Sequence, residues 1–280
     1  MSGSTVDLNK YPVSIGTTFN YDIPLREQLP MLGRLGFRYI SLGARVNHSG
    51  YLSTSGRRRI KKMVASHGIR ICSLHTPLDR NMDISSTDNV KTRKTMECYR
   101  RCIDAAQYLG ARVVIFHPTA YKQFDEPGWR KQVIVESVHR LLDYARDTDV
   151  SLAVENEHFR PANDILSFSL DTITNAKYGF CYDTSHDNLT NHPLKLLKKY
   201  GHRLMTTHIS DNRGERDDHM LPYEGSFPWP AFCQTFSRIN FRGIFLLEVE
   251  MRESAFVSPS EFLQEAFIRG QRLLRSCRKL

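Results

Sequence analysis

Residues 112–119 read RVVIFHPT, residues 128–149 read GWRKQVIVESVHRLLDYARDTD, and residues 150–156 read VSLAVEN. The first and last segments are short runs of apolar and β-branched residues, typical of buried strands. The longer middle segment has the pattern of a helix. A strand, a helix and another strand in this order predict a parallel pair of strands joined by a right-handed crossover.

The same unit recurs along the chain. Strand-like segments occupy residues 13–18, 39–44, 69–77, 112–119, 150–156, 178–186, 203–211 and 243–251, and helical patterns follow at 24–36, 53–68, 88–111, 128–149, 161–175, 193–203, 228–240 and 258–280. Glycines in LGF, LGA, HGI and RGI end helices just before strands, and Ser258 followed by Pro259 begins the last helix. Eight such units predict an α/β fold, a (β/α)8 TIM barrel. An open nucleotide-binding sheet is disfavoured because no glycine-rich loop follows the first strand.

Length and composition agree with a globular protein. The chain has 280 residues, of which 40% are hydrophobic and 25% charged, and no linker divides it. We therefore predict a single domain over residues 1–280, with a flexible segment over residues 1–11. The sequence contains no long apolar run and its first residues lack a signal-peptide pattern, so we expect a cytoplasmic protein without a membrane partner. The six scattered cysteines argue against a disulfide framework.

The chain carries a formal net charge of +9 and its pI is about 9.3, which favours anionic partners. Two basic runs, RRRIKK (57–62) and RSCRKL (275–280), hold much of this charge. Both fall in predicted helices, where a solvated outer face accounts for them. Charge alone therefore identifies no partner.

Acids and histidines collect at the predicted carboxyl ends of the strands, where TIM barrels build their active sites. These residues are His75, His117, Glu155, Asp183, His186, His208 and Glu248, with Asp217 and His219 in the loop after the seventh strand. Taken singly, each could be an ordinary hydrogen-bonded residue. Their convergence from six consecutive strands predicts a metal site. Glu248 lies among apolar residues, where an unpaired acid costs several kcal/mol to bury. Glu250, two residues further along the same strand, points to the same face and competes for the role of Glu248.

Carboxylates with imidazoles suit Mn²⁺, Co²⁺, Zn²⁺ or Fe²⁺, and more than one ion is compatible with the number of candidates. Mg²⁺ favours fewer histidines. No cysteine is placed to act as a ligand, which argues against a thiolate site.

The motifs HTP, FHP, VEN, YDTSH, HISDN, DDHMLPYEG and LLEVE, in this order, resemble the xylose isomerase-like barrel superfamily. This superfamily includes sugar isomerases and epimerases and the endonuclease IV-type DNA-repair enzymes. Resemblance to the sugar branch implies one divalent metal held by Glu155, Asp183, His208 and Glu248. It also implies that Glu155 and Glu248 are the catalytic acid/base pair. Substrate contacts are expected from His75, His117, His186 and Arg213.

The nuclease branch binds three zinc ions, and its additional ligands would fall on His75, His117, His186, Asp217 and His219. All of these are present. Other segments depart from the nuclease pattern. LLEVE stands where the nucleases carry a glutamate followed by threonine and proline, and SIGTTFNYD and TAYKQFDEPGW lack the expected small or histidine-containing patterns.

The leading hypothesis is a metal-dependent isomerase or epimerase of a keto-sugar, polyol-derived ketone or sugar acid, working by proton transfer through an enediolate. A lyase or dehydratase is a near variant. The substrate would be a small sugar-like molecule, neutral or anionic, and a homo-oligomer is compatible with the sequence. The alternative is an endonuclease IV-like phosphodiesterase that acts on abasic DNA, for which Tyr121–Trp129 is the only candidate DNA-inserting loop. A non-catalytic metal-binding subunit is the third hypothesis.

Overall fold

The computed structural model describes residues 13–79, 81–120 and 127–278. The predicted flexible segment over residues 1–11 lies outside the described residues, as do residues 121–126 of the candidate DNA-inserting loop.

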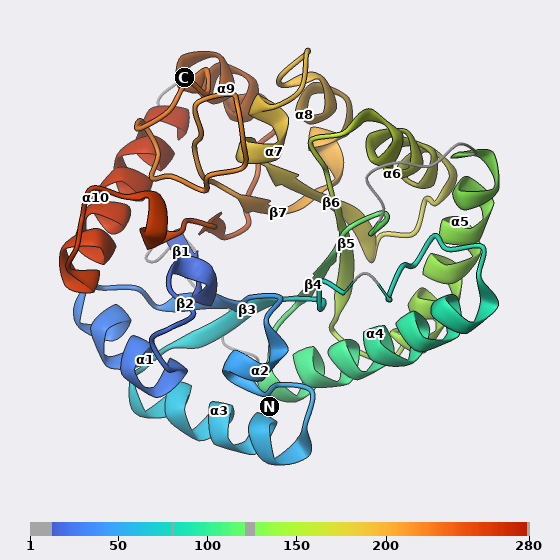
Figure 1. The fold of residues 1–280 in the computed structure, drawn as a ribbon, viewed down its shortest axis with the longest axis horizontal. Helices are drawn as coiled ribbons and strands as arrows, with labels where there is room; N and C mark the ends of the chain where they lie inside the picture. Colours follow the sequence, from blue (N-terminus) through green and yellow to red (C-terminus); the bar gives the residue numbers. More distant parts are fainter. Residues whose placement is uncertain (1–12, 80, 121–126, 279–280) are drawn as a thin grey trace.

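Eight parallel strands form one sheet, and each begins within or at the edge of a segment that the sequence predicts as a strand (Figure 1). They are β1 (Val13–Gly16), β2 (Tyr39–Leu42), β3 (Arg70–His75), β4 (Val113–Phe116), β5 (Ser151–Glu155), β6 (Tyr178–Asp183), β7 (Leu204–His208) and β8 (Phe245–Leu247). From β1 to β7, each strand pairs with the next strand along the chain, and β8 pairs with β1. The predicted (β/α)8 TIM barrel is confirmed.

The barrel closes between β7 and β8, where the two strands make fewer contacts than the other pairs of neighbouring strands. Ile209, just beyond β7, forms an isolated parallel bridge with Leu247. Its amide donates to the Leu246 carbonyl at 2.9 Å, and its carbonyl accepts from the amide of Glu248 at 3.1 Å. This seam therefore lies directly beside two of the predicted metal ligands.

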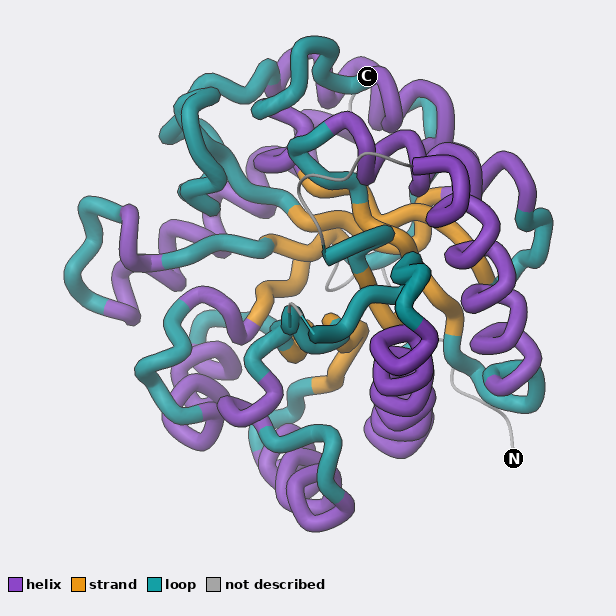
Figure 2. The backbone as a smooth tube through the Cα atoms, turned by 45° about the vertical axis from the view of Figure 1, so that its right-hand side comes forward, coloured by secondary structure: helices purple, strands orange, loops and turns teal. Residues whose placement is uncertain are grey.

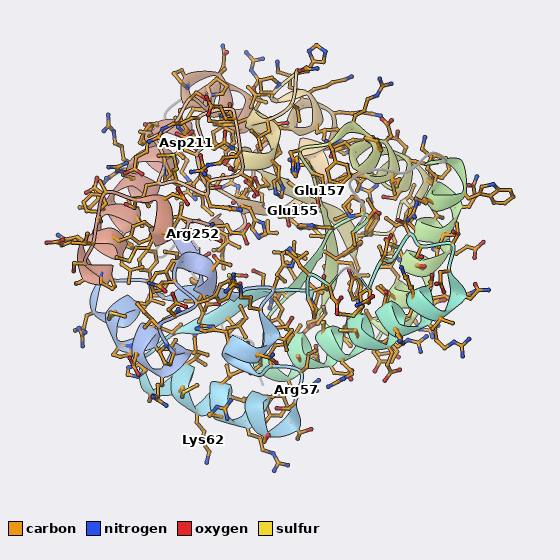
Figure 3. The ribbon with its side chains drawn as sticks, in the orientation of Figure 1. Arg57, Lys62, Glu155, Glu157, Asp211 and Arg252 are labelled. Carbon is orange, nitrogen blue, oxygen red and sulfur yellow. The ribbon has the colours of Figure 1, made fainter. Side chains whose placement is uncertain are left out.

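Helices surround the strands, as Figures 1 and 2 show. The longer ones are α1 (Leu25–Arg34), α3 (Thr54–Ser66), α4 (Asn89–Leu109), α5 (Pro127–Tyr144), α6 (Arg160–Thr172), α8 (Lys195–Tyr200), α9 (Trp229–Ser237) and α10 (Pro259–Arg278). Short turns of 3₁₀ helix occupy Thr17–Phe19, Gly201–Arg203 and Met251–Glu253. The basic run in α3 has a buried Ile60 and mostly exposed charges, and Lys62 points outward in Figure 3, so a solvated face accounts for this run. Within the described ranges, no helix has the length and apolar character needed to cross a membrane.

Two short helices, α2 (Val46–Ser49) and α7 (Thr184–Asn188), are absent from the sequence-based assignment. The second changes the position of His186, which was expected at the end of a strand. The strand ends at Asp183, whose side chain accepts a hydrogen bond from the His186 amide at 2.7 Å and so caps α7. A capping aspartate begins a helix because it satisfies a backbone N–H that has no partner in the first turn. His186 therefore lies in the first turn of α7.

The barrel interior is filled by a small apolar cluster of Ile115, Ala153, Cys181 and Leu246. Strand side chains alternate between the two faces of a sheet, so residues two positions further along point the same way. Those residues are His117, Glu155, Asp183 and Glu248. The acids and histidines therefore form the next inward-facing layer above the apolar floor, at the carboxyl ends of the strands.

Candidate metal centre

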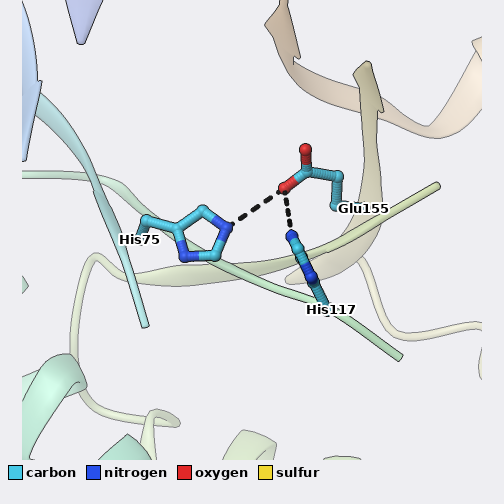
Figure 4. Close-up of side chains that lie close together, drawn as sticks. All are labelled: His75, His117 and Glu155. Carbon is cyan, nitrogen blue, oxygen red and sulfur yellow. Dashed lines mark hydrogen bonds and ion pairs between the residues drawn. The ribbon is translucent and has the colours of Figure 1, made fainter. Parts of the chain in front are cut away.

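Glu155 is the centre of the site. Its side chain is only 1% exposed and contacts histidines from three other strands. The Nδ1 atom of His208 lies 2.7 Å from Oε1, and the Nε2 atoms of His75 and His117 lie 3.2 Å and 3.4 Å from Oε2. Figure 4 shows the His75 and His117 rings pointing at the same carboxylate oxygen. One carboxylate thus joins two groups of potential metal ligands.

The first group is the predicted ligand set of the sugar branch. Glu155, Asp183, His208 and Glu248 each offer one donor atom, and these four atoms lie within 4.8 Å of one another. His208 Nδ1 is 2.9 Å from Glu248 Oε2 and 3.8 Å from Asp183 Oδ2. Asp183 Oδ2 is buried and has no hydrogen-bond partner within the described chain. A buried carboxylate oxygen without a partner is costly, and a cation at this position would satisfy it.

The histidines are oriented as metal-binding histidines usually are. His75 Nδ1 lies 2.7 Å from the Thr76 carbonyl, and His186 Nδ1 lies 2.8 Å from the Asn156 carbonyl. A ring nitrogen that faces a carbonyl must carry the hydrogen, so in the neutral ring Nε2 presents its lone pair to the site. Outer partners of this kind fix the tautomer of metal ligands. The residues present therefore fit a divalent metal ion.

Four further groups of donors adjoin the first. One joins Cys181 to Glu155 and His208, so the expectation that no cysteine is placed to act as a ligand is wrong, and another consists of Glu157, His158 and His186. The remaining two contain only residues that the sequence predicts for the site. His75, His117 and Glu155 form one of them. His186, Asp217 and His219 form the other, and both histidine Nε2 atoms lie 3.1 Å from Asp217 Oδ2. The structure thus brings together all the additional ligands that resemblance to the nuclease branch implies.

The charges of the site are those expected of a cation-binding site, with protonated histidines in the place of a cation. Burial raises the pKa of Asp183 to about 7. Burial also acts on Glu248, but the neighbouring His208 outweighs it and lowers the pKa of this acid to about 2. For His117, burial opposes protonation, yet the carboxylates of Glu157 and Glu155 raise its pKa to about 10. The acids thus favour positive charge among them, either as protons on histidines or as a metal ion.

A cavity of about 1000 Å³ opens above the metal centre. The predicted site residues that line it are His75, His117, Glu155, His186, Asp217, His219 and Glu248. Asp183 and His208 lie below, fully buried. The structure does not bring Arg213 to this cavity, because its side chain is exposed and is not part of the wall. Glu250 lines the cavity but belongs to none of the donor groups, and it pairs with Arg252 at 3.3 Å.

Two acids that the sequence analysis does not single out support the site. Glu157 is buried, and its Oε1 lies 2.6 Å from His117 Nδ1, so it orients that ring. Asp211 is fully buried toward α9 and α10 and holds the loop that carries Asp217 and His219 (Figure 3). The signal for Glu157 was a second acid two residues after Glu155 in VENEH. Nothing in the sequence distinguishes Asp211 from its neighbouring acids.

Relatives and solved structures agree with this architecture. The chain is 26% identical over 284 residues to the uncharacterized protein y4fM of Sinorhizobium fredii, covering 90% of this chain and 89% of that protein. It is 24% identical over 229 residues to the uncharacterized protein MJ1311 of Methanocaldococcus jannaschii, covering 77% and 76% of the two chains.

Among solved structures, a zinc-bound IOLI protein superposes with a TM-score of 0.82 at 17% identity, covering 94% of this chain and 98% of that one. An L-ribulose 3-epimerase superposes with a TM-score of 0.80 at 17% identity, covering 96% of each chain. The family model described as xylose isomerase-like TIM barrel matches residues 31–277. A match over this much of the sequence, on a barrel whose donor residues stand at its carboxyl end, establishes that the chain belongs to the xylose isomerase-like TIM barrel family.

Proposed function

We propose that this protein is a divalent-metal-dependent isomerase or epimerase of a sugar-like ketone, with a lyase or dehydratase as a near variant. The observation that carries the proposal is the four-residue donor group of Glu155, Asp183, His208 and Glu248 at the floor of a large cavity. A divalent metal held there, such as Mn²⁺, Co²⁺ or Zn²⁺, would stabilise negative charge on substrate oxygens. The epimerases among the solved structures with this fold support the proposal.

Glu155 and Glu248 are the proposed acid/base pair. Each has a carboxylate oxygen close to His208 Nδ1, at 2.7 Å and 2.9 Å, so both carboxyl groups adjoin the same candidate metal ligand. The low pKa of Glu248 keeps it ionised at neutral pH, and its side chain is 15% exposed to the cavity. One carboxylate would take the proton from the carbon next to the substrate carbonyl, whose oxygen receives the electron pair. The other carboxyl group would return a proton to the opposite face or to the adjacent carbon.

The remaining histidines would bind and orient the substrate. His75, His117 and His186 stand on the cavity wall and are fixed by their outer hydrogen bonds. Such fixed donors hold substrate oxygens in one position while the proton moves.

The test is incorporation of deuterium from D₂O at a substrate carbon, measured by NMR across a panel of ketoses, sugar acids and sugar phosphates with Mn²⁺, Co²⁺ or Zn²⁺. We expect exchange with at least one class, and a loss of about 10²–10⁴-fold in Glu248→Gln. Exchange that is absent from the whole panel would reject the proposal.

A second function, a phosphodiesterase of the endonuclease IV type, is favoured by one observation. Two of the further donor groups, built on His75 with His117 and on Asp217 with His219, supply positions for further ions. Several metals together can activate water and stabilise the leaving oxygen of a phosphodiester. Nicking of abasic duplex DNA in the presence of Zn²⁺ or Mn²⁺, and three metal ions bound per chain, would support it. One ion per chain and intact DNA would exclude it.

A further inference from the structure

Arg45 gives the cavity a positive charge that the sequence analysis does not anticipate. It follows β2 and lines the cavity wall together with Tyr21 and Thr18. Among the described residues of this wall it is the only lysine or arginine, whereas five acids line the same cavity: Asp79, Glu155, Asp217, Glu248 and Glu250.

The guanidinium of Arg45 is held by an aromatic ring, and no described carboxylate lies within ion-pair distance of it. Its central carbon lies 4.7 Å from the centroid of the Tyr21 ring. Glu250, an acid of the same wall, is paired with Arg252 instead. A guanidinium stacked on a ring keeps the N–H groups at its edge free for a planar or tetrahedral anion.

The Tyr21 hydroxyl lies close to Arg45, and Thr18 lines the same cavity wall. The Tyr21 hydroxyl accepts a hydrogen bond from the Arg45 backbone amide at 3.4 Å. Gly43 permits this position, because a Cβ at residue 43 would lie 2.2 Å from the Tyr21 oxygen. Burial raises the pKa of Tyr21 to about 12, so the hydroxyl keeps its proton at neutral pH. The Thr18 hydroxyl is buried and has no hydrogen-bond partner in the described chain.

We propose that Arg45, with the Tyr21 hydroxyl, binds an anionic group of the substrate, either a carboxylate or a phosphate. This inference rests on the proposed function, which it makes more specific: the substrate is an acidic or phosphorylated sugar, while a neutral ketose binds weakly. A neutral sugar needs no fixed cation on the cavity wall. An anionic one is attracted to the Arg45 guanidinium and forms charge-assisted hydrogen bonds with it.

The test compares probes that share a ketose framework and differ in charge. Binding of D-fructose, 2-keto-D-gluconate and D-fructose 6-phosphate to the Mn²⁺-loaded protein is measured by calorimetry, and deuterium exchange is followed for the same compounds. We expect at least one anionic probe to bind more than about tenfold tighter than fructose, and Arg45→Gln to remove most of that difference. Arg45→Lys should restore part of it, because it keeps the charge without the planar fork.

Arg160→Gln is the matched control. It removes one positive charge from an arginine side chain that is 90% exposed on α6 and is not part of the cavity wall, so probe affinities should not change. Circular dichroism of each variant checks that it folds.

The outcomes separate this inference from the proposed function. Exchange of fructose as efficient as that of the anionic probes, unaffected by Arg45→Gln, would overturn the inference and leave the proposed function standing. Arg45-dependent binding of the anionic probes without any deuterium exchange would support the anion site and count against the isomerase. Arg45-dependent binding of abasic DNA, with no binding of the small anions, would overturn the assignment to acidic sugars.

Discussion

At the scale of single residues, the candidate metal centre depends on side chains outside the four-residue donor group of Glu155, Asp183, His208 and Glu248. Glu157 is one of them, since its carboxylate fixes the His117 ring at 2.6 Å. Asp211 is another, since each of its oxygens accepts two N–H groups of the loop after β7. The donors are the amides of Asn212, Tyr223 and Phe227 and the indole N–H of Trp229.

At the donor group of His75, His117 and Glu155, which the second function would load with an ion, replacing Glu157 with glutamine should weaken metal binding by about 10–100-fold, which is typical for loss of the outer partner of a ligand histidine. The glutamine amide is a poorer acceptor and does not raise the basicity of the ring. Metal affinity is measured by competition with a fluorescent chelator, without reference to turnover. Glu136→Gln, an exposed substitution on α5, is the control and should leave the affinity unchanged. Equal affinities of Glu157→Gln and the unsubstituted protein would show that this contact has no role in metal binding.

Replacing Asp211 with asparagine should lower the free energy of unfolding by about 2–6 kcal/mol. The amide nitrogen cannot accept, so two buried N–H groups lose their acceptor, each at a cost of about 1–3 kcal/mol. Urea denaturation followed by tryptophan fluorescence, to which the exposed Trp129 and the buried Trp229 both contribute, measures the change. The exposed Asp22→Asn serves as the control. A change within about 0.5 kcal/mol, the range of ordinary surface substitutions, would contradict the anchoring role.

At the scale of elements, helix starts and strand ends decide where side chains point. The eight strands were predictable because alternating short apolar and long amphipathic segments indicate parallel strands joined by helices, and eight such units fit a closed barrel. The short helices α2 and α7 were not, because a helix of four or five residues has no periodicity to detect. The start of α7 depends on whether the Asp183 carboxylate caps a backbone N–H. The sequence shows Asp183 as the end of a strand but does not show that its side chain also begins a helix.

Asp88 offers a test of helix capping. Its carboxylate accepts from the amides of Val90 and Lys91 at 2.8 Å and 3.2 Å, and these bonds lower its pKa below the usual value of 3.8. A lowered pKa in the folded state means that the stabilisation is fully present above pH 3.8 and is lost as pH falls through the folded-state pKa. Asp88→Ala should therefore lower the Tm at pH 6 and have a smaller effect near pH 3.

Thermal unfolding monitored by circular dichroism between pH 3 and pH 6 measures this difference. Asp88→Asn is the comparison, because asparagine caps a helix well but carries no charge. A Tm difference between Asp88→Ala and the unsubstituted protein that stays constant with pH would show that the charged carboxylate contributes nothing.

At the scale of the whole molecule, the candidate ligands come from β5, β6, β7 and β8, and the barrel closes between the last two. A bound metal would therefore join strands that are far apart in sequence and reinforce the seam at Ile209 and Leu247. Binding to the folded state alone adds about 4 kcal/mol when the free ion exceeds its Kd about 1000-fold. We expect chelation to lower the Tm by several degrees.

Hydrogen exchange locates this effect. The amides of Ile209 and Glu248, which form the seam, should exchange faster after chelation than those between β4 and β5. Equal acceleration in all strands, or none at the seam, would show that the metal does not hold the barrel closed.

The same geometry explains how much of the fold and of the candidate site could be predicted from the sequence. Acids and histidines at strand ends were predictable as one site because parallel strands in a barrel present their carboxyl ends together. Arg213 and Arg45 show the limit. Both follow a strand, yet only Arg45 reaches the cavity wall, because the path of each loop depends on contacts such as that between Gly43 and Tyr21. Loop conformations are set by tertiary packing, which no local pattern records.

The floor of the cavity and the part of its wall around Arg45 are contributed by different parts of the chain, and this separation bears on how the protein could change over evolution. The proposed metal ligands and acid/base pair come from the second half of the sequence, whereas Thr18, Tyr21 and Arg45 come from its first 45 residues. The proposed anion site and the proposed reactive centre are thus encoded in different parts of the chain. Exchanging the two loops after β1 and β2 for those of another barrel would give a new specificity without disturbing the reactive centre.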